Sequence, residues 1–193
     1  LLINREYSQL QLMHHQILGD RQFLFRHLAL NVQIMGDEYG TITPLQSYDY
    51  TAVARWLDLL DALDPRSDYA PAMAAHYFGA VQDAGRVRIM VDYLRRHTAR
   101  DPTGKWRWLT HAAFLARHRA HDLPLALEVA RQLAAIDVPD IPVWTKQMPA
   151  FVLAEVGERE AARDLMAVLL ETSPNLSPEE RNYMRDYIDR MSR

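Results

Sequence analysis

Apolar residues recur at helical spacing along most of this chain. Between Thr51 and Leu63 they stand three and four positions apart, whereas Asp58 and Asp61 occupy the opposite side of the pattern. A period near 3.6 residues with one apolar side is typical of an amphipathic helix. The pattern predicts a helix there and another over residues 21–35, separated by the longest predicted loop, residues 36–48.

Four prolines divide the rest of the chain into units of similar length. Pro65, Pro102, Pro139 and Pro174 stand 37, 37 and 35 residues apart. Proline disfavours the α conformation in the residue before it. Each of these sites is therefore expected to end one helix and to open the next unit.

Each unit contains two helical patterns separated by a polar turn. The turns are short polar segments at Asp83–Gly85, Arg117–Asp122 and Gly157–Glu158. After the last unit, one further helix is predicted to begin near Pro178. Ser177 and Glu180 have the spacing of a capping box around a proline at the first helical position.

The second helices of these units share an order of side chains: a small residue, two apolar residues four and seven positions later, and a closing proline. These are Ala161, Leu165, Val168 and Pro174 in the third unit, and Ala126, Ala130, Leu133 and Pro139 in the second. The first helix of the second unit adds Trp108, Ala112 and Leu115. This arrangement resembles the tetratricopeptide repeat (TPR) family, in which small residues let two helices approach closely. The resemblance implies that Ala161 faces its partner helix and that Ala162 does not.

The resemblance also implies an all-α fold, namely a right-handed α-solenoid of TPR-like helix-turn-helix pairs with a C-terminal capping helix. Residues 1–48 are then an N-terminal helical extension or a divergent repeat, with a further helix predicted over about 5–17. Residues 49–193 hold the repeats, at about 66–101, 102–138 and 139–173, followed by the capping helix over 178–192.

Composition and charge exclude several classes of protein. Hydrophobic residues make up 49% of the chain, enough for a core, and a net charge of −3 gives no general basic field for nucleic acid. Cysteine is absent, which excludes disulfide scaffolds, thiolate zinc sites and cysteine nucleophiles. The longest uncharged stretch, Tyr69 to Gln82, is too short and too polar for a transmembrane segment.

The chain starts at Leu1 rather than at an initiator methionine. We therefore expect that something upstream was removed, which leaves room for a signal or an anchor. The expected compartment is the bacterial cytoplasm or periplasm.

No pattern in the chain points to catalysis or to a bound cofactor. His111, His118 and His121 lack metal-ligand spacing such as HxxxH or HExxH, and neighbouring arginines would repel a cation. Asp58 and Asp61 are expected on the solvent face of their helix, and the GxSxG motif of serine hydrolases is absent. We expect no enzyme activity, no metal and no cofactor.

A basic cluster is formed by Arg95, Arg96, His97 and Arg100, and aromatic residues follow it. Such a cluster can contact phosphate or bases, but acidic residues flank it on both sides. We interpret it as a solvated helix end. In the segment that follows, Trp108 is predicted in the repeat core and Trp106 half exposed.

In the family that this chain resembles, the first helices form the inner surface of the array, where a partner binds. On this chain that surface is predicted to be apolar and aromatic: Tyr69, Ala72, His76, Ala80, Trp106, Leu109, Ala113, Arg117 and Lys146, with Val143 and Ala150. We therefore predict a protein-interaction scaffold or adaptor that binds an apolar or aromatic partner segment, anchored on Tyr69, Trp106 and Leu109. No nucleic-acid partner is expected.

Two other functions fit the same sequence. One is a structural subunit of a larger bacterial assembly, attached to a membrane or free of it. The other is a ligand-binding or enzymatic domain with its site in the N-terminal 65 residues. A deep pocket with convergent polar groups between the first helices and the repeats would favour this last alternative.

Overall fold

The computed structural model describes residues 20–35, 37–38, 41–139 and 141–193. In these residues the fold is all-α, as the periodicity predicts, and comprises nine α-helices. The helix predicted over residues 5–17 lies outside the described residues. Within the predicted loop, Asp37–Glu38 (β1) pairs antiparallel with Thr41–Ile42 (β2), and Leu45–Ser47 forms a 3₁₀ turn.

The helices follow one another along the chain. Their bounds are α2 (Arg21–Ile34), α3 (Tyr50–Leu63), α4 (Tyr69–Ala72), α5 (Ala84–Ala99), α6 (Pro102–His118), α7 (Leu123–Ala134), α8 (Trp144–Val156), α9 (Arg159–Thr172) and α10 (Pro178–Met191). α4 runs directly into a π-helical turn, Met73–Tyr77, and a 3₁₀ turn, Phe78–Ala80. We call residues 69–80 the α4 segment.

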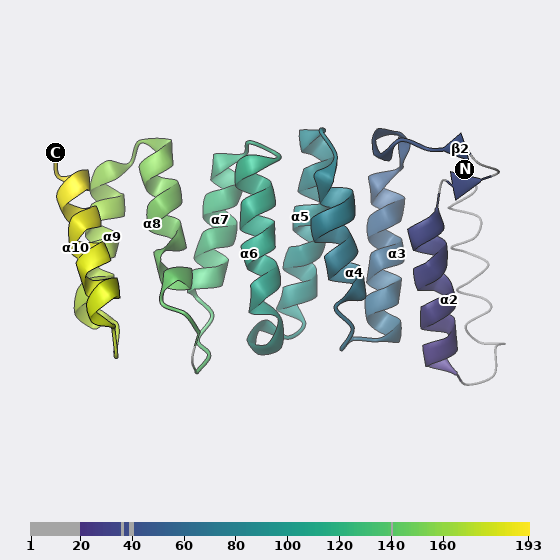
Figure 1. Ribbon diagram of the computed structural model, residues 1–193, viewed down its shortest axis with the longest axis horizontal. Coiled ribbons are helices and arrows are strands. Elements are labelled where there is room, and N and C mark those ends of the chain that lie inside the picture. Colours follow the sequence, from purple (N-terminus) through teal and green to yellow (C-terminus); the bar gives the residue numbers. More distant parts are fainter. Residues whose placement is uncertain (1–19, 36, 39–40, 140) are drawn as a thin grey trace.

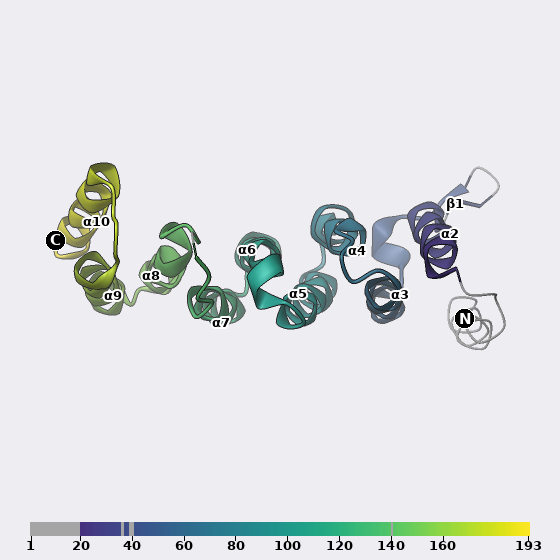
Figure 2. The ribbon, with the colours of Figure 1, turned by 90° about the horizontal axis from the view of Figure 1, so that it is seen from below.

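The helices stand side by side in one elongated row, from α2 at one end to α10 at the other (Figure 1). Seen from below, they alternate between two layers (Figure 2). The first-helix layer holds α2, the α4 segment, α6, α8 and α10, and the second-helix layer holds α3, α5, α7 and α9. From α5 onward each helix packs against the next one in the sequence, and α3 packs against α2 and α5.

Aspartate side chains cap the N-termini of five of these helices. Asp20, Asp49, Asp83, Asp101 and Asp122 each accept hydrogen bonds from backbone N–H groups in the following first turn. Those N–H groups have no partner inside the helix, so the caps stabilise the helix starts. The same bonds hold the pKa of Asp101 and of Asp122 below the usual value of an aspartate.

The prolines of the repeat lie where they were predicted to interrupt helices: Pro65, Pro139 and Pro174 in links between helices, and Pro102 at the first position of α6. The capping box of α10 is confirmed. The backbone N–H of Glu180 donates to the Ser177 hydroxyl, and the backbone N–H of Ser177 donates to the Glu180 carboxylate.

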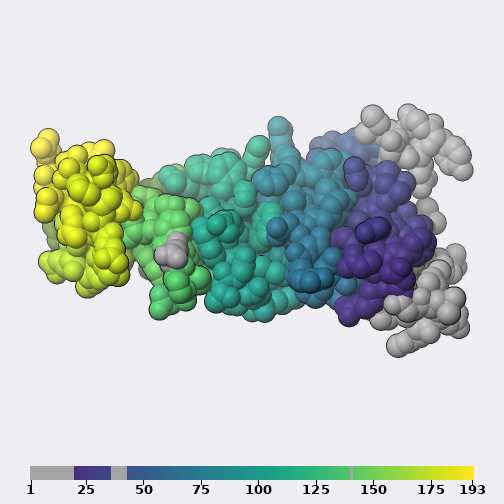
Figure 3. All heavy atoms as spheres, turned by 60° about the horizontal axis from the view of Figure 1, so that its bottom comes forward, coloured from purple at the N-terminus to yellow at the C-terminus, as the bar shows by residue number. Residues whose placement is uncertain are grey.

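The buried apolar side chains form two clusters. The larger reaches from α2 to α8 and includes Phe78 and Tyr93. The smaller joins α8, α9 and α10 through Ala150, Leu153, Ala162, Met166, Leu176, Met184 and Tyr187. α8 contacts both clusters, because Val152 belongs to the larger and Leu153 to the smaller. The space-filling view shows the same elongated molecule from another side, with the C-terminal helices at one end (Figure 3).

The register predicted for α9 is wrong by one residue. Ala162 is fully buried and Ala161 is exposed. In three second helices the residue four positions after the N-cap faces the core: Val87, Ala126 and Ala162. Two consecutive alanines carry no signal of their own about which one is buried.

Candidate interaction surface

The predicted groove residues on α6 point inward. Trp106, Leu109 and Ala113 are 8%, 5% and 2% exposed. Trp108, predicted between helices, is only partly buried, and its Nε1 donates to Asp68 at 3.2 Å. Residues two positions apart on a helix lie about 200° apart. Because the sequence pattern placed Trp108 in the core, it placed Trp106 on the opposite, solvent-facing side of α6, whereas Trp106 is the more buried of the two.

Three further groove residues are engaged in contacts within the chain. The Tyr69 hydroxyl donates to the backbone carbonyl of Ala29 in α2 at 3.0 Å. Arg117 forms an ion pair with Glu155 of α8 at 2.5 Å. Nζ of Lys146 donates to two carbonyls at the end of α7, at 2.8 and 2.6 Å, and so caps that helix. These side chains join neighbouring helices and are not open anchors.

The remaining predicted groove residues divide by exposure. Ala72 and Val143 are partly buried, and Ala150 is fully buried. His76 and Ala80, both on the α4 segment, are exposed. The predicted layer thus does reach the surface, but mostly through residues other than those predicted.

Each of four successive first helices exposes one large aromatic side chain. These are Tyr77 at the end of the α4 segment, Phe114 on α6, Trp144 on α8 and Tyr183 on α10, with exposed fractions of 39–52%. We call these four side chains the aromatic face. Tyr77, Phe114 and Trp144 each directly follow a residue that was predicted from sequence to lie on the partner-binding surface, so that prediction was one residue too early on these helices. It assigned no residue of α10 to that surface.

Ring contacts connect the helices that carry the aromatic face. His76 and His111 meet edge to face with centroids 4.8 Å apart, which joins the α4 segment to α6. Trp144 lies 6.1 Å from Trp106 across α6 and α8. Phe151 then contacts Tyr183, at 6.4 Å, across α8 and α10. Aromatic or histidine rings therefore link every neighbouring pair of first helices from the α4 segment to α10.

Little net charge accompanies these rings. Burial, and secondarily the neighbouring His76, lowers the pKa of His111, so its imidazole is neutral at neutral pH. Glu155 offsets the charge of Arg117. Arg107 lies over the Trp106 ring, 4.7 Å from its centroid. An aromatic surface bordered by the exposed Arg107 is suited to apolar contacts.

On the second-helix layer, a buried polar cluster joins α3 to α5. Oδ2 of Asp61 accepts hydrogen bonds from the Tyr93 hydroxyl at 2.9 Å and from Arg100 at 2.6 Å. The same oxygen lies 2.8 Å from Nδ1 of His97. Burial, reinforced by Asp61, raises the pKa of Tyr93, so the phenol keeps the proton that it donates.

The expectation that Asp61 and His97 face solvent is wrong. Asp61 is 3% exposed and His97 is 0% exposed. One signal was present in the sequence, since Asp61 follows Val53 and Leu57 at four-residue steps, on the buried stripe of α3. A carboxylate on such a stripe needs buried donors, and those come from α5, more than thirty residues further along the chain.

The arginines of the predicted basic cluster are neutralised by carboxylates. Arg96 and Arg100 pair with Asp58 of α3 at 2.9 and 2.8 Å. Arg95 pairs with Glu128 of α7 at 2.5 Å. The cluster therefore joins helices, and its charge is not available to a phosphate.

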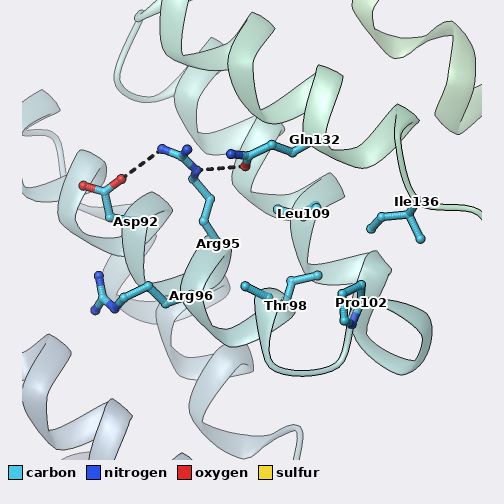
Figure 4. A pocket seen from close by; sticks show the side chains of 9 residues that line it. Asp92, Arg95, Arg96, Thr98, Pro102, Leu109, Gln132 and Ile136 are labelled. Atoms are coloured by element: carbon cyan, nitrogen blue, oxygen red, sulfur yellow. Dashed lines mark hydrogen bonds and ion pairs between the residues drawn. The ribbon is translucent and has the colours of Figure 1, made fainter.

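A hollow of about 500 Å³ lies beside Arg95, between α5 and α7 (Figure 4). Arg95 extends across it between Asp92 and Gln132 (Figure 4). Its lining is mainly apolar and includes Leu109, so this predicted groove residue borders a hollow in the second-helix layer instead of the first. A second hollow, of about 510 Å³, lies between α7 and α9.

Both hollows, and a third along α7, lie between α5 and α9, away from the N-terminal helices. Within the described ranges, no three histidine or acidic side chains are placed to hold a metal ion. In the same residues, no helix has the length and apolar character needed to cross a bilayer.

Comparison with known proteins adds no relative. No family model, no curated protein and no solved structure matches this chain.

Proposed function

We propose that this chain is a protein-interaction scaffold whose partner binds the aromatic face. The observation that carries this proposal is the presence of one exposed aromatic side chain on each of four successive first helices, Tyr77, Phe114, Trp144 and Tyr183. Ring contacts link the helices that carry these side chains, and aromatic residues are enriched at protein–protein interfaces. Aromatic side chains also supply most of the energy at such sites.

We also propose that the helices form a right-handed solenoid of TPR-like pairs. Its support is the alternation of helices between two layers and the position of Pro65, Pro102, Pro139 and Pro174 between successive pairs. In that architecture the first helices line the surface that receives the partner. The anchors proposed here replace Trp106 and Leu109, which are buried.

The partner segment is expected to be apolar or aromatic, and extended or helical. A segment of this kind fits a surface whose exposed anchors are aromatic rings. A partner that never separates from the chain in native extracts would make the chain a structural subunit rather than a transient adaptor.

The test compares two double variants in partner capture from extracts of the native source. Phe114→Ser with Tyr183→Ser removes two anchors from different first helices and should abolish capture of a protein that the unchanged chain retains. Phe23→Ser with Val168→Ser removes two apolar residues that are at least as exposed but lie outside the aromatic face, and should leave capture unchanged. Circular dichroism should show equal helicity in all three proteins. Equal capture by the two variants would refute the proposal.

A further inference from the structure

Arginine–carboxylate pairs join neighbouring second helices across their layer. Arg96 of α5 pairs with Asp58 of α3, and Arg95 of α5 pairs with Glu128 of α7. Between α7 and α9 no ion pair occurs in the described part of the chain. The last junction of the layer thus lacks the contact that the first two have.

The position of each residue relative to its N-cap explains the missing pair. Arg95 stands twelve residues after Asp83, the N-cap of α5. The residue twelve positions after Asp122, the N-cap of α7, is Ala134. α7 therefore presents a methyl group where α5 presents the guanidinium that crosses to the next helix.

At this junction, where no ion pair joins the two helices among the described residues, a groove lies between α7 and α9, with α8 as its floor. We call it the α7–α9 groove; its volume is about 510 Å³, and its apolar lining comes chiefly from Pro149, Leu153, Leu165 and Leu169. Leu165 and Leu169 are only partly buried, so their apolar surface is incompletely covered. Burying that surface would be favourable.

Two cations border the α7–α9 groove on its α7 side. Arg131 is exposed, and among the described residues no carboxylate lies at ion-pair distance from its guanidinium. Lys146 also lines the groove, and its ammonium group contacts only carbonyl oxygens. The acidic side chain nearest in sequence, Glu128, is already paired with Arg95. The groove therefore combines apolar walls with unbalanced positive charge.

We propose that the α7–α9 groove receives a helical segment of a partner protein, which places leucine-like side chains against α8 and a carboxylate against Arg131. A similar contact exists within the chain. α7 lies beside α5 in the second-helix layer, and its Glu128 carboxylate pairs with Arg95 of α5. A helix fits between two helices by packing its ridges into their grooves. This site lies in the layer opposite the aromatic face and does not depend on it.

The test uses a displayed library of helical peptides of about four turns. On one face of each peptide helix, every position carries leucine, isoleucine, valine or phenylalanine. Every other position is chosen at random from alanine, glutamate, lysine and glutamine. Selection on the full chain should enrich glutamate beside the apolar stripe. Fluorescence anisotropy with a selected peptide should show binding weakened about tenfold or more by Arg131→Glu and also weakened by Leu165→Asp.

Two controls separate this site from other effects. Arg119→Glu makes the same charge change at an exposed arginine on the C-terminal side of α6 and should alter affinity less than about twofold. Replacing the selected glutamate by arginine should restore binding to the Arg131→Glu protein. Phe114→Ser should leave peptide binding intact, so failure of the aromatic face and failure of this groove are distinguishable.

Three outcomes would overturn the assignment. Selected peptides without a preference for glutamate, or with affinity insensitive to Arg131→Glu, would show that the groove does not recognise a carboxylate. Self-association of the chain that Arg131→Glu abolishes would make the occupant a second copy. Binding of dodecanoate at the groove, with no peptide selected, would assign it to a fatty acid.

Discussion

At the scale of single residues, Asp61 is the centre of the buried polar cluster that joins α3 to α5. One of its oxygens accepts from Tyr93 and Arg100 and contacts His97. Its other oxygen and Nε2 of His97 are buried and have no hydrogen-bond partner among the described residues. Such a cluster is stabilising only while it is complete, since each member left alone is a buried polar group without a partner.

Asp61→Ala is therefore expected to lower the free energy of unfolding by about 3–5 kcal/mol, because it leaves buried donors on α5 without their acceptor. Asp58→Ala is the matched control. Its side chain is 28% exposed and pairs with arginines that solvent reaches, so its loss should cost about 1 kcal/mol or less. Urea unfolding monitored by circular dichroism measures both values. Equal costs would show that Asp61 is not the centre of the cluster.

At the scale of elements, caps and prolines determine where the helices lie, and packing determines which side each helix buries. α7 shows agreement between the two, because the predicted Ala126, Ala130 and Leu133 are all fully buried. α9 shows the difference, because its predicted bounds are correct and its predicted face is shifted by one residue, from Ala162 to Ala161.

The face of α9 can be tested with two adjacent substitutions. Ala162→Leu should destabilise the protein by about 1–3 kcal/mol, because the extra carbon atoms have no space in the cluster shared with α8 and α10. Ala161→Leu should change stability by about 0.5 kcal/mol or less, because that side chain projects to solvent. Thermal and urea unfolding measure the difference. A larger cost at Ala161 would return the helix to the register predicted from sequence.

At the scale of the whole molecule, the elongated row and the two clusters limit how far a local change spreads. The helices contact mainly others one or two places along the row, and α8 contributes buried side chains to both clusters. In arrays with nearest-neighbour contacts, stability is close to a sum of local terms. The C-terminal cluster should therefore open separately from the rest.

Met184→Ala tests this separation. Met184 is fully buried in the C-terminal cluster, so truncation should cost that cluster about 2–5 kcal/mol. Hydrogen exchange followed by mass spectrometry should show faster exchange in α9 and α10 and unchanged exchange in α5 and α6. Met90→Ala, at a fully buried site on α5, should give the reverse pattern. A uniform loss of protection in both variants would mean that the molecule unfolds as one unit.

The sequence by itself determined the all-α fold class and most helix boundaries, because these depend on interactions between residues a few positions apart. Ser177 and Glu180 cap α10 from within one turn, and Pro102 begins α6 through its own ring. Apolar periodicity acts over the same short range. Such features can be recognised without knowledge of the neighbouring helices.

Only the tertiary structure decided which side chains face the core and which face a partner. A helix with neighbours on several sides buries a wide arc of its surface, so its apolar pattern leaves the phase undetermined, as Trp106 and Trp108 demonstrate. The aromatic face and the α7–α9 groove both depend on that phase. The burial of Asp61 depends on Tyr93 and Arg100, 32 and 39 residues away, and only folding brings them to the same oxygen.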